Sequence, residues 1–194
     1  MSVLYRKIKI IIKNNNFHKN VLFAALNCEK LLPIYDVFHR KCQWGDTACL
    51  KEQIILLYDI ALQRTPIFGI EDIKEKLQLI APDLDDFNTP LASYALDVCC
   101  SFDEVLEYLV SHNNKNIENS ITHIIDTIDL YIQLKNNIEY GDPHLEYKID
   151  SDIIMQQEYE RQLSILQKIK TNNITEDFIL EIRTYNNDLK NIIM

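Results

Sequence analysis

The sequence predicts an all-α protein, a single helical bundle of eight or nine helices spanning residues 1–194. Apolar residues recur at three- and four-residue spacing along most of the chain, which places them on one face of a helix. No stretch alternates convincingly between apolar and polar residues, as a half-buried strand does. Three glycines leave few positions for phosphate-binding loops or tight hairpins, which depend on positive φ angles. Rossmann, P-loop and all-β folds are therefore disfavoured.

The first half of the chain divides into short helices at recognisable stops. An asparagine run at 14–16 closes a helix predicted over residues 3–13. Pro33 has no backbone N–H and its ring clashes with the preceding turn, so we expect it to end a second helix over 17–32. A third helix over 34–43 then stops before Gly45.

The middle of the chain carries two signals for helix starts. Asp46 precedes a helix predicted over 47–63, and Thr89 starts a helix that reaches Ser111. Aspartate and threonine side chains accept hydrogen bonds from the free N–H groups of a first helical turn. Between these two helices we expect a third over 70–80, followed by a break at 81–83.

The second half shows the clearest helical periodicity. One predicted helix carries a stripe of isoleucines at Ile117, Ile121, Ile124, Ile128 and Ile132. After a break at 141–143 the sequence predicts two more helices, one along residues 153–169 and one that Thr175 caps and that continues to Ile192. The apolar faces of all these helices must be buried against one another.

The N-terminal segment and the cysteines indicate a compartment. The longest apolar run in residues 1–13 is three isoleucines, too short for a signal peptide or a membrane span. The five cysteines are an odd number, which is typical of a reducing environment. We therefore predict a cytoplasmic protein with no structural disulfide.

All of the net charge lies in one central window. Residues 77–134 contain ten acidic residues and a single base, Lys115, so their net charge of −9 equals that of the whole chain. A field of this sign repels nucleic acid and anionic lipid and attracts basic partners. We expect a protein partner, with neither nucleic acid nor a membrane bound.

Six acidic residues of this window are the predicted partner-binding residues. Part of the run also suits capping of the neighbouring helices, but the run is longer than capping needs. We expect these carboxylates to form one acidic face: Asp83, Asp85, Asp86, Asp103, Glu104 and Glu107.

One further group of polar residues could carry chemistry. His123, Asp126 and Asp129 share one side of a predicted helix, and an imidazole beside carboxylates can act in acid–base catalysis or bind a metal. The same spacing also occurs on the solvent face of any amphipathic helix. The sequence therefore predicts no catalytic residue, no metal site and no cofactor, and we expect a protein that is not an enzyme.

Several short motifs resemble a known family in their order and spacing. They lie at residues 23–33, 44–46, 81–83, 85–87 and 95–99. Over nearly the whole chain this order resembles the YjaG-like family of bacterial proteins of unknown function. The resemblance implies an all-helical cytosolic protein with no established activity, for which gene neighbourhoods suggest a link to signalling.

Three functions remain open. The leading hypothesis is an immunity protein that neutralises a basic, nuclease-type toxin passed between competing bacteria, because such a toxin exposes a positive substrate cleft. The alternative is a housekeeping signalling adaptor that binds a regulatory protein such as a histidine kinase. A third is an enzyme with a carboxylate or metal site, built from Asp46, Asp86 and Asp97 if these residues of the family motifs converge.

Overall fold

The computed structural model describes residues 3–139 and 141–186. Within these ranges it contains nine α-helices, one short 3₁₀ helix and no strand, which confirms the all-α class. The elements are α1 (Val3–Asn14), α2 (Phe17–Cys42), α3 (Thr47–Ala61), α4 (Ile70–Ile80), η1 (Leu84–Asp86), α5 (Pro90–Ser111), α6 (Asn114–Asn136), α7 (Leu145–Ser151), α8 (Ile153–Thr171) and α9 (Glu176–Arg183).

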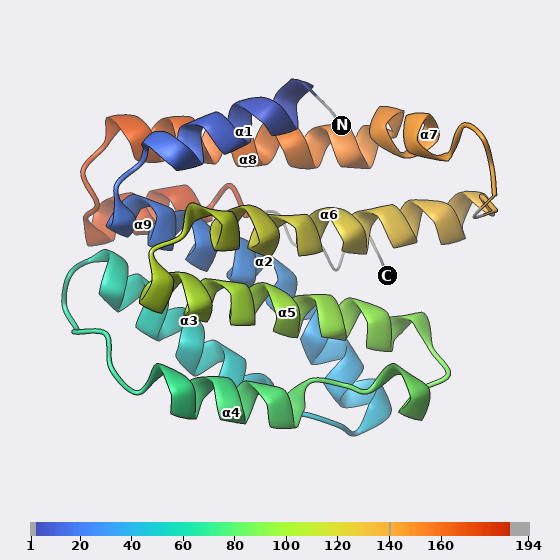
Figure 1. Cartoon of the computed structure of the whole chain (residues 1–194), viewed down its shortest axis with the longest axis horizontal. Helices are drawn as coiled ribbons and strands as arrows, with labels where there is room; N and C mark the ends of the chain where they lie inside the picture. Colours follow the sequence, from blue (N-terminus) through green and yellow to red (C-terminus); the bar gives the residue numbers. More distant parts are fainter. Residues whose placement is uncertain (1–2, 140, 187–194) are drawn as a thin grey trace.

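Helix α2 is central to the bundle, where it packs against α3, α5, α6 and α8. Its residues from Asn20 to Cys28 are all buried. Figure 1 shows α5 in front, between α4 and α6, while α1 runs along α8 at one edge. A single cluster of buried apolar side chains includes residues of all nine α-helices. On its solvent side, α5 therefore lies between α4 and α6.

The prediction of two helices separated at Pro33 is wrong, because α2 continues through this residue. A proline inside a helix costs about 3 kcal/mol. The flanking residues Ile34, Tyr35 and Phe38 are fully buried, and burial of each such side chain stabilises the fold by about 1.5–3 kcal/mol. Packing in the core therefore outweighs the local stop signal.

The prediction of two helices after the break at 141–143 is also incomplete, because the structure has three. Asp152 separates α7 from α8 with an extended backbone (ψ 138°), and its carboxylate accepts the N–H of Ile154 at 2.8 Å. The last helix, α9, ends at Arg183, so the predicted continuation is wrong for residues 184–186, and its remainder over 187–192 lies outside the described residues.

The N-terminal caps predicted from the sequence are present. Asp46, Thr89 and Thr175 each accept a hydrogen bond from a backbone N–H of the following first turn, at 2.8, 3.3 and 3.1 Å. Each such cap is worth about 1 kcal/mol. Together they fix where α3, α5 and α9 begin.

The turn between α2 and α3 requires glycine at position 45. Gly45 has a φ of +79°, and a Cβ there would lie 2.0 Å from the hydroxyl oxygen of Tyr35. That hydroxyl donates a hydrogen bond to the carbonyl of Ile80 at 2.7 Å and accepts one from the N–H of Asp46 at 3.3 Å. One tyrosine therefore connects α2, the turn and the end of α4.

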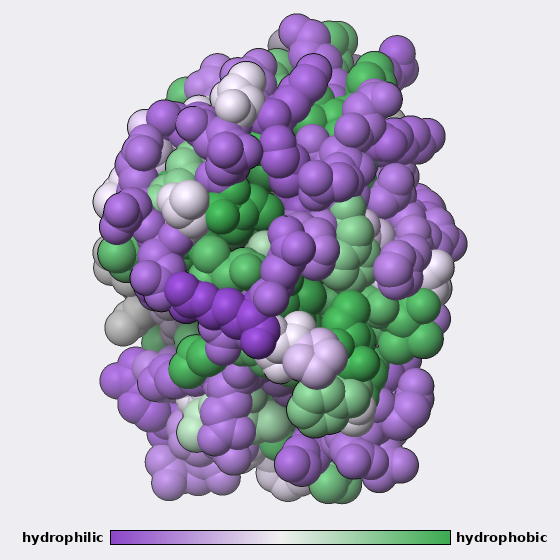
Figure 2. Space-filling model, turned by 90° about the vertical axis from the view of Figure 1, so that its left-hand side faces the viewer, coloured by the Kyte–Doolittle hydropathy of each residue, from purple (hydrophilic) through white to green (hydrophobic). Residues whose placement is uncertain are grey.

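Exposed apolar residues lie at the end of the bundle drawn in Figure 2, where apolar side chains (green) reach the surface between hydrophilic ones. Phe68 of the α3–α4 loop is 72% exposed, and Ile55 and Leu180 line one shallow pocket between α3 and α9. In the described ranges, no helix is both long and apolar enough to pass through a lipid bilayer.

Candidate functional site

A groove with a cavity volume of about 360 Å³ runs along the solvent side of α5, between the walls formed by α4 and α6. Apolar side chains of α4 and α5 line much of it, and charged residues of α5 add to the lining. We call it the acidic groove, and its lining residues are Leu77, Gln78, Ala81, Leu96, Cys99, Cys100, Asp103, Glu104 and His123.

Helical spacing explains why α5 presents this lining. Leu96, Cys100 and Asp103 follow one another at four- and three-residue spacing, so they share one face of α5. The opposite face carries fully buried residues such as Phe102. The core thus holds α5 in the rotation that turns its carboxylates toward the groove.

The six predicted partner-binding residues divide into two sets. Asp83, Asp85 and Asp86 are exposed, just before and within η1. Asp83 also caps η1, because its carboxylate accepts the N–H of Asp85 at 3.1 Å. The remaining three lie half-buried on α5.

The three acids on α5 already have partners within the protein. Lys74 Nζ lies 2.9 Å from Glu107 Oε2 and 3.7 Å from Asp103 Oδ1. The hydrogen bond to Glu107 raises the pKa of Lys74. Glu104 accepts hydrogen bonds from two asparagine amides of α6, at 2.8 and 2.9 Å. The groove is therefore less negative than the sequence window, since Lys74 comes from outside that window and neutralises one charge.

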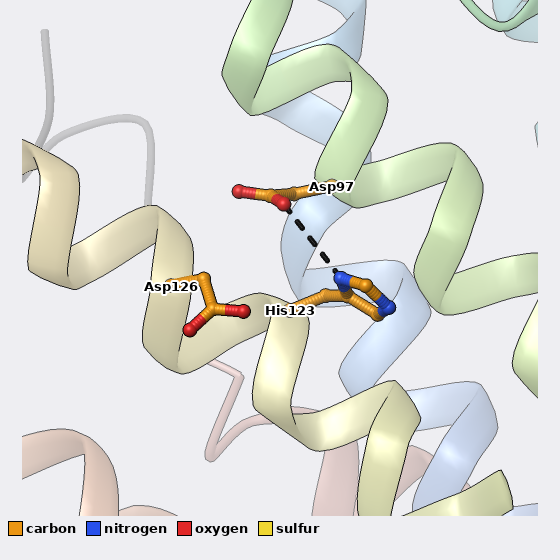
Figure 3. A group of neighbouring side chains, drawn as sticks. All are labelled: Asp97, His123 and Asp126. Carbon is orange, nitrogen blue, oxygen red and sulfur yellow. Dashed lines mark ion pairs between the residues drawn. The ribbon is translucent and has the colours of Figure 1, made fainter.

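Asp97, His123 and Asp126 form a second cluster between α5 and α6 (Figure 3). Each offers one potential ligand atom, and these atoms all lie within 4.8 Å of one another. The distance from His123 Nδ1 to Asp97 Oδ1 is 3.6 Å. The other oxygen of Asp97 accepts a hydrogen bond from the hydroxyl of Thr127 at 2.9 Å. Because His123 also lines the acidic groove, the cluster borders it.

The electrostatics of this cluster favour protons or cations. Desolvation raises the pKa of Asp126, and the neighbouring Asp97 carboxylate raises it further, while His123 lowers it. Desolvation also raises the pKa of Asp129, whose carboxylate is held by the Gln133 amide at 2.6 Å. Asp129 therefore pairs with Gln133 and is not part of the Asp97–His123–Asp126 cluster.

The structure regroups the residues that the sequence suggested for an enzyme site. Asp46 caps α3 and Asp86 lies in η1, and neither joins Asp97 in a metal-ligating group among the described residues. Instead Asp97 meets His123 and Asp126, which the sequence had placed with Asp129. Spacing along one helix finds neighbours on that helix, whereas partners across helices depend on how the helices pack.

A buried network of charges was not predicted from the sequence. Glu158 of α8 is buried, and Arg161 donates hydrogen bonds to its two carboxylate oxygens at 2.6 and 2.9 Å. Lys30 of α2 lies 3.5 Å away, and Gln162 donates at 2.8 Å. Burial alone would raise the pKa of Glu158, but Arg161, Lys30 and Gln162 outweigh it, so that the pKa lies below its usual range.

Comparison with known proteins establishes the family. Residues 7–192 match a family model described as "Protein of unknown function (DUF416)". The chain belongs to the DUF416 family. This agrees with the predicted resemblance, because the relatives of this chain include the uncharacterized protein YjaG of Salmonella typhimurium, 19% identical over 85% of this chain and 83% of that protein.

Two further comparisons agree with this result. An uncharacterized protein of Haemophilus influenzae is 22% identical over 82% of this chain and 80% of its own length. A crystal structure of a DUF416 family protein from Shewanella baltica has a TM-score of 0.82 at 23% identity, covering 96% of this chain and 94% of that one. This chain therefore shares its fold with the solved DUF416 protein of Shewanella baltica.

Proposed function

We propose that this protein is a non-enzymatic binding protein whose acidic groove takes up a basic segment of a protein partner. The observation that carries the proposal is the composition of the groove. Its lining combines apolar residues such as Leu77 and Leu96 with the carboxylates of Asp103 and Glu104. Exposed carboxylates at Asp85 and Asp86 lie in η1, just beyond the end of α4.

A basic amphipathic helix fits this lining. Its apolar face would cover the apolar residues of the groove, and its lysines or arginines would pair with the carboxylates of the lining. Such complementarity speeds association by long-range attraction and selects against acidic partners. Of the six predicted acids, only Asp103 and Glu104 line the groove, and Lys74 already neutralises part of the field of Asp103. The carboxylates of η1 lie outside the lining and would add to the long-range attraction.

For the partner itself we propose a basic, nuclease-type toxin domain, with this protein as its cytoplasmic immunity protein. Support comes from the net charge of −9 within residues 77–134, since a nuclease exposes a positive cleft for its substrate. A regulatory protein bound by a signalling adaptor is the alternative, and it would use the same groove.

The test combines capture with charge reversal. The full chain would be used to capture partners from native lysate and from products of adjacent genes, and the association rate of any captured protein would be measured at low and high salt. We expect a basic protein whose association slows at least tenfold with salt and in the double variant Asp86→Lys, Asp103→Lys.

The matched control is Glu52→Lys with Glu71→Lys, which changes the net charge equally at two exposed positions outside the groove. Equal slowing in both double variants would overturn the groove proposal, because the effect would then reflect net charge alone. Inhibition of a captured nuclease by the wild type would support the immunity function. A captured regulatory protein without nuclease activity would replace it with the adaptor function.

A further inference from the structure

We propose that Asp97, His123 and Asp126 bind a divalent transition-metal ion, a site that departs from the prediction of no metal. The three side chains come from two neighbouring helices. His123 and Asp126 are three residues apart on α6 and therefore lie on one face, and Asp97 of α5 lies opposite them (Figure 3). Their ligand atoms lie within 4.8 Å of one another.

The charge of the cluster is not balanced by a base. Among the described residues, the imidazole of His123 is the only basic group that forms an ion pair with Asp97 within 4.0 Å. Within the same residues, no lysine or arginine forms such a pair with Asp126. Other carboxylates of the same window differ, since Glu118 lies 3.6 Å from both Lys9 and Lys115. Two carboxylates and an imidazole form a site that a cation would stabilise.

The imidazole supplies the second observation. His123 Nδ1 is shielded from solvent and makes no hydrogen bond within the described part of the chain. It is directed at Asp97, but the 3.6 Å separation is longer than a hydrogen bond. A shielded polar atom without a partner destabilises the fold, and coordination to a metal would give this nitrogen its partner.

Asp97 is held in an orientation suited to a ligand. The hydroxyl of Thr127 donates to Asp97 Oδ2 at 2.9 Å, which fixes the carboxylate and leaves Oδ1 on the side of the imidazole. Hydrogen bonds of this kind commonly orient metal ligands. Ligand atoms around a metal at about 2.0–2.2 Å lie at most about 4.4 Å apart, so small side-chain rotations close the site.

The ligand set indicates the type of metal. One imidazole with two carboxylates suits Zn²⁺ or Mn²⁺, whereas Ca²⁺ and Mg²⁺ prefer oxygen ligands throughout. Three protein ligands leave coordination positions open for water or for another ligand. The site is independent of the proposed groove function, because its test needs only the purified chain and the metal.

The experiment is a titration of the full chain, freed of metal by a chelator, with Zn²⁺ and separately with Mn²⁺ in a calorimeter. Co²⁺ absorption in the visible range would report the coordination number. We expect one equivalent to bind, and we expect Asp97→Asn, His123→Gln and Asp126→Asn each to weaken binding by about 100-fold or more, beyond the 10–100-fold typical of outer-shell changes.

The matched control is Asp129→Asn, one turn further along α6 and outside the cluster, which should bind as the wild type does. Cys100→Ser should likewise leave the Co²⁺ spectrum unchanged, because the thiol is not in the ligand set. Circular dichroism of each variant without metal separates loss of a ligand from loss of the fold. Weak, unsaturable binding in the wild type, or equal binding in His123→Gln, would overturn the proposal.

Discussion

Two clusters of this protein each combine carboxylates with nitrogen bases, but they shift the pKa of a carboxylate in opposite directions. In the buried network, the Glu158 carboxylate is enclosed with Lys30 and Arg161, and its pKa is lowered. In the Asp97–His123–Asp126 cluster, carboxylates lie together beside an imidazole, and the pKa of Asp126 is raised. The more deeply buried carboxylate is thus the one that holds its charge more firmly.

The difference teaches that the local balance of charges, and not burial alone, sets the direction of a pKa shift. Helices α2 and α8 bring two bases to one acid in the core. Helices α5 and α6 bring acids to each other, because the sequence window that forms them contains a single lysine, Lys115. Three substitutions test this contrast, from the largest expected effect to the smallest.

Replacement of Glu158 by glutamine should have the largest effect. The variant removes the carboxylate that Arg161 and Lys30 both contact in the core, so we expect the free energy of unfolding to fall by about 3–5 kcal/mol. Urea denaturation at pH 7 measures it. Glu160→Gln, at an exposed position of the same helix, should change stability by less than about 0.5 kcal/mol. A loss below 1 kcal/mol in Glu158→Gln would break the comparison.

The wild type and Glu158→Gln should also differ in how their stability depends on pH. Because the folded pKa of Glu158 lies below the unfolded value, its contribution is complete above about pH 4.3 and is lost as the pH falls through the folded pKa. The wild type should therefore lose more stability than Glu158→Gln on acidification through that range. Parallel acid unfolding curves would contradict the lowered pKa.

Replacement of Lys30 by methionine should cost less. The bonds between Arg161 and Glu158, at 2.6 and 2.9 Å, would remain and keep the carboxylate neutralised. We expect a loss of about 1.5–3 kcal/mol, the range of an interaction with a charged group. Urea denaturation beside Glu158→Gln gives the ratio. A loss equal to that of Glu158→Gln would show that Lys30 does as much as the carboxylate to hold the network together.

Replacement of Asp126 by asparagine should have the smallest effect, and of opposite sign. The raised pKa means that the folded protein holds the ionised form of Asp126 less well than the unfolded chain does, so wild-type stability falls as pH rises through this range. We expect Asp126→Asn to stabilise the metal-free protein by less than about 1 kcal/mol at pH 7 and not at pH 3.

Thermal denaturation in a chelator at both pH values measures this change. Asp85→Asn, at an exposed position of η1, is the matched control and should leave stability unchanged at both. A destabilised Asp126→Asn at pH 7 would mean that the Asp97–His123–Asp126 cluster is balanced after all.

Features set by neighbouring residues could be predicted from the sequence. The caps at Asp46, Thr89 and Thr175 depend on one side chain and the next turn, and the structure has all three. The continuation of α2 through Pro33 could not be predicted this way, because burial among distant helices decides it.

The candidate sites show the same limit. The charges of residues 77–134 were readable, but Lys74, which neutralises part of the groove, lies outside that window and meets Glu107 only in the fold. The position of Glu158 is itself informative, because it lies three residues after Met155 and four before Gln162, and both of these residues are on the buried face of α8. A charged residue on a buried helix face indicates an internal partner.

The hydroxyl of Tyr35 has a consequence for how the molecule opens. It holds the carbonyl that ends α4 and the amide of Asp46 in the turn that Gly45 makes possible. These segments are distant in sequence, yet both hydrogen-bond to the same hydroxyl group. Displacement of the Tyr35 side chain would release both at once, and hydrogen exchange at the Asp46 amide reports on this opening of the turn.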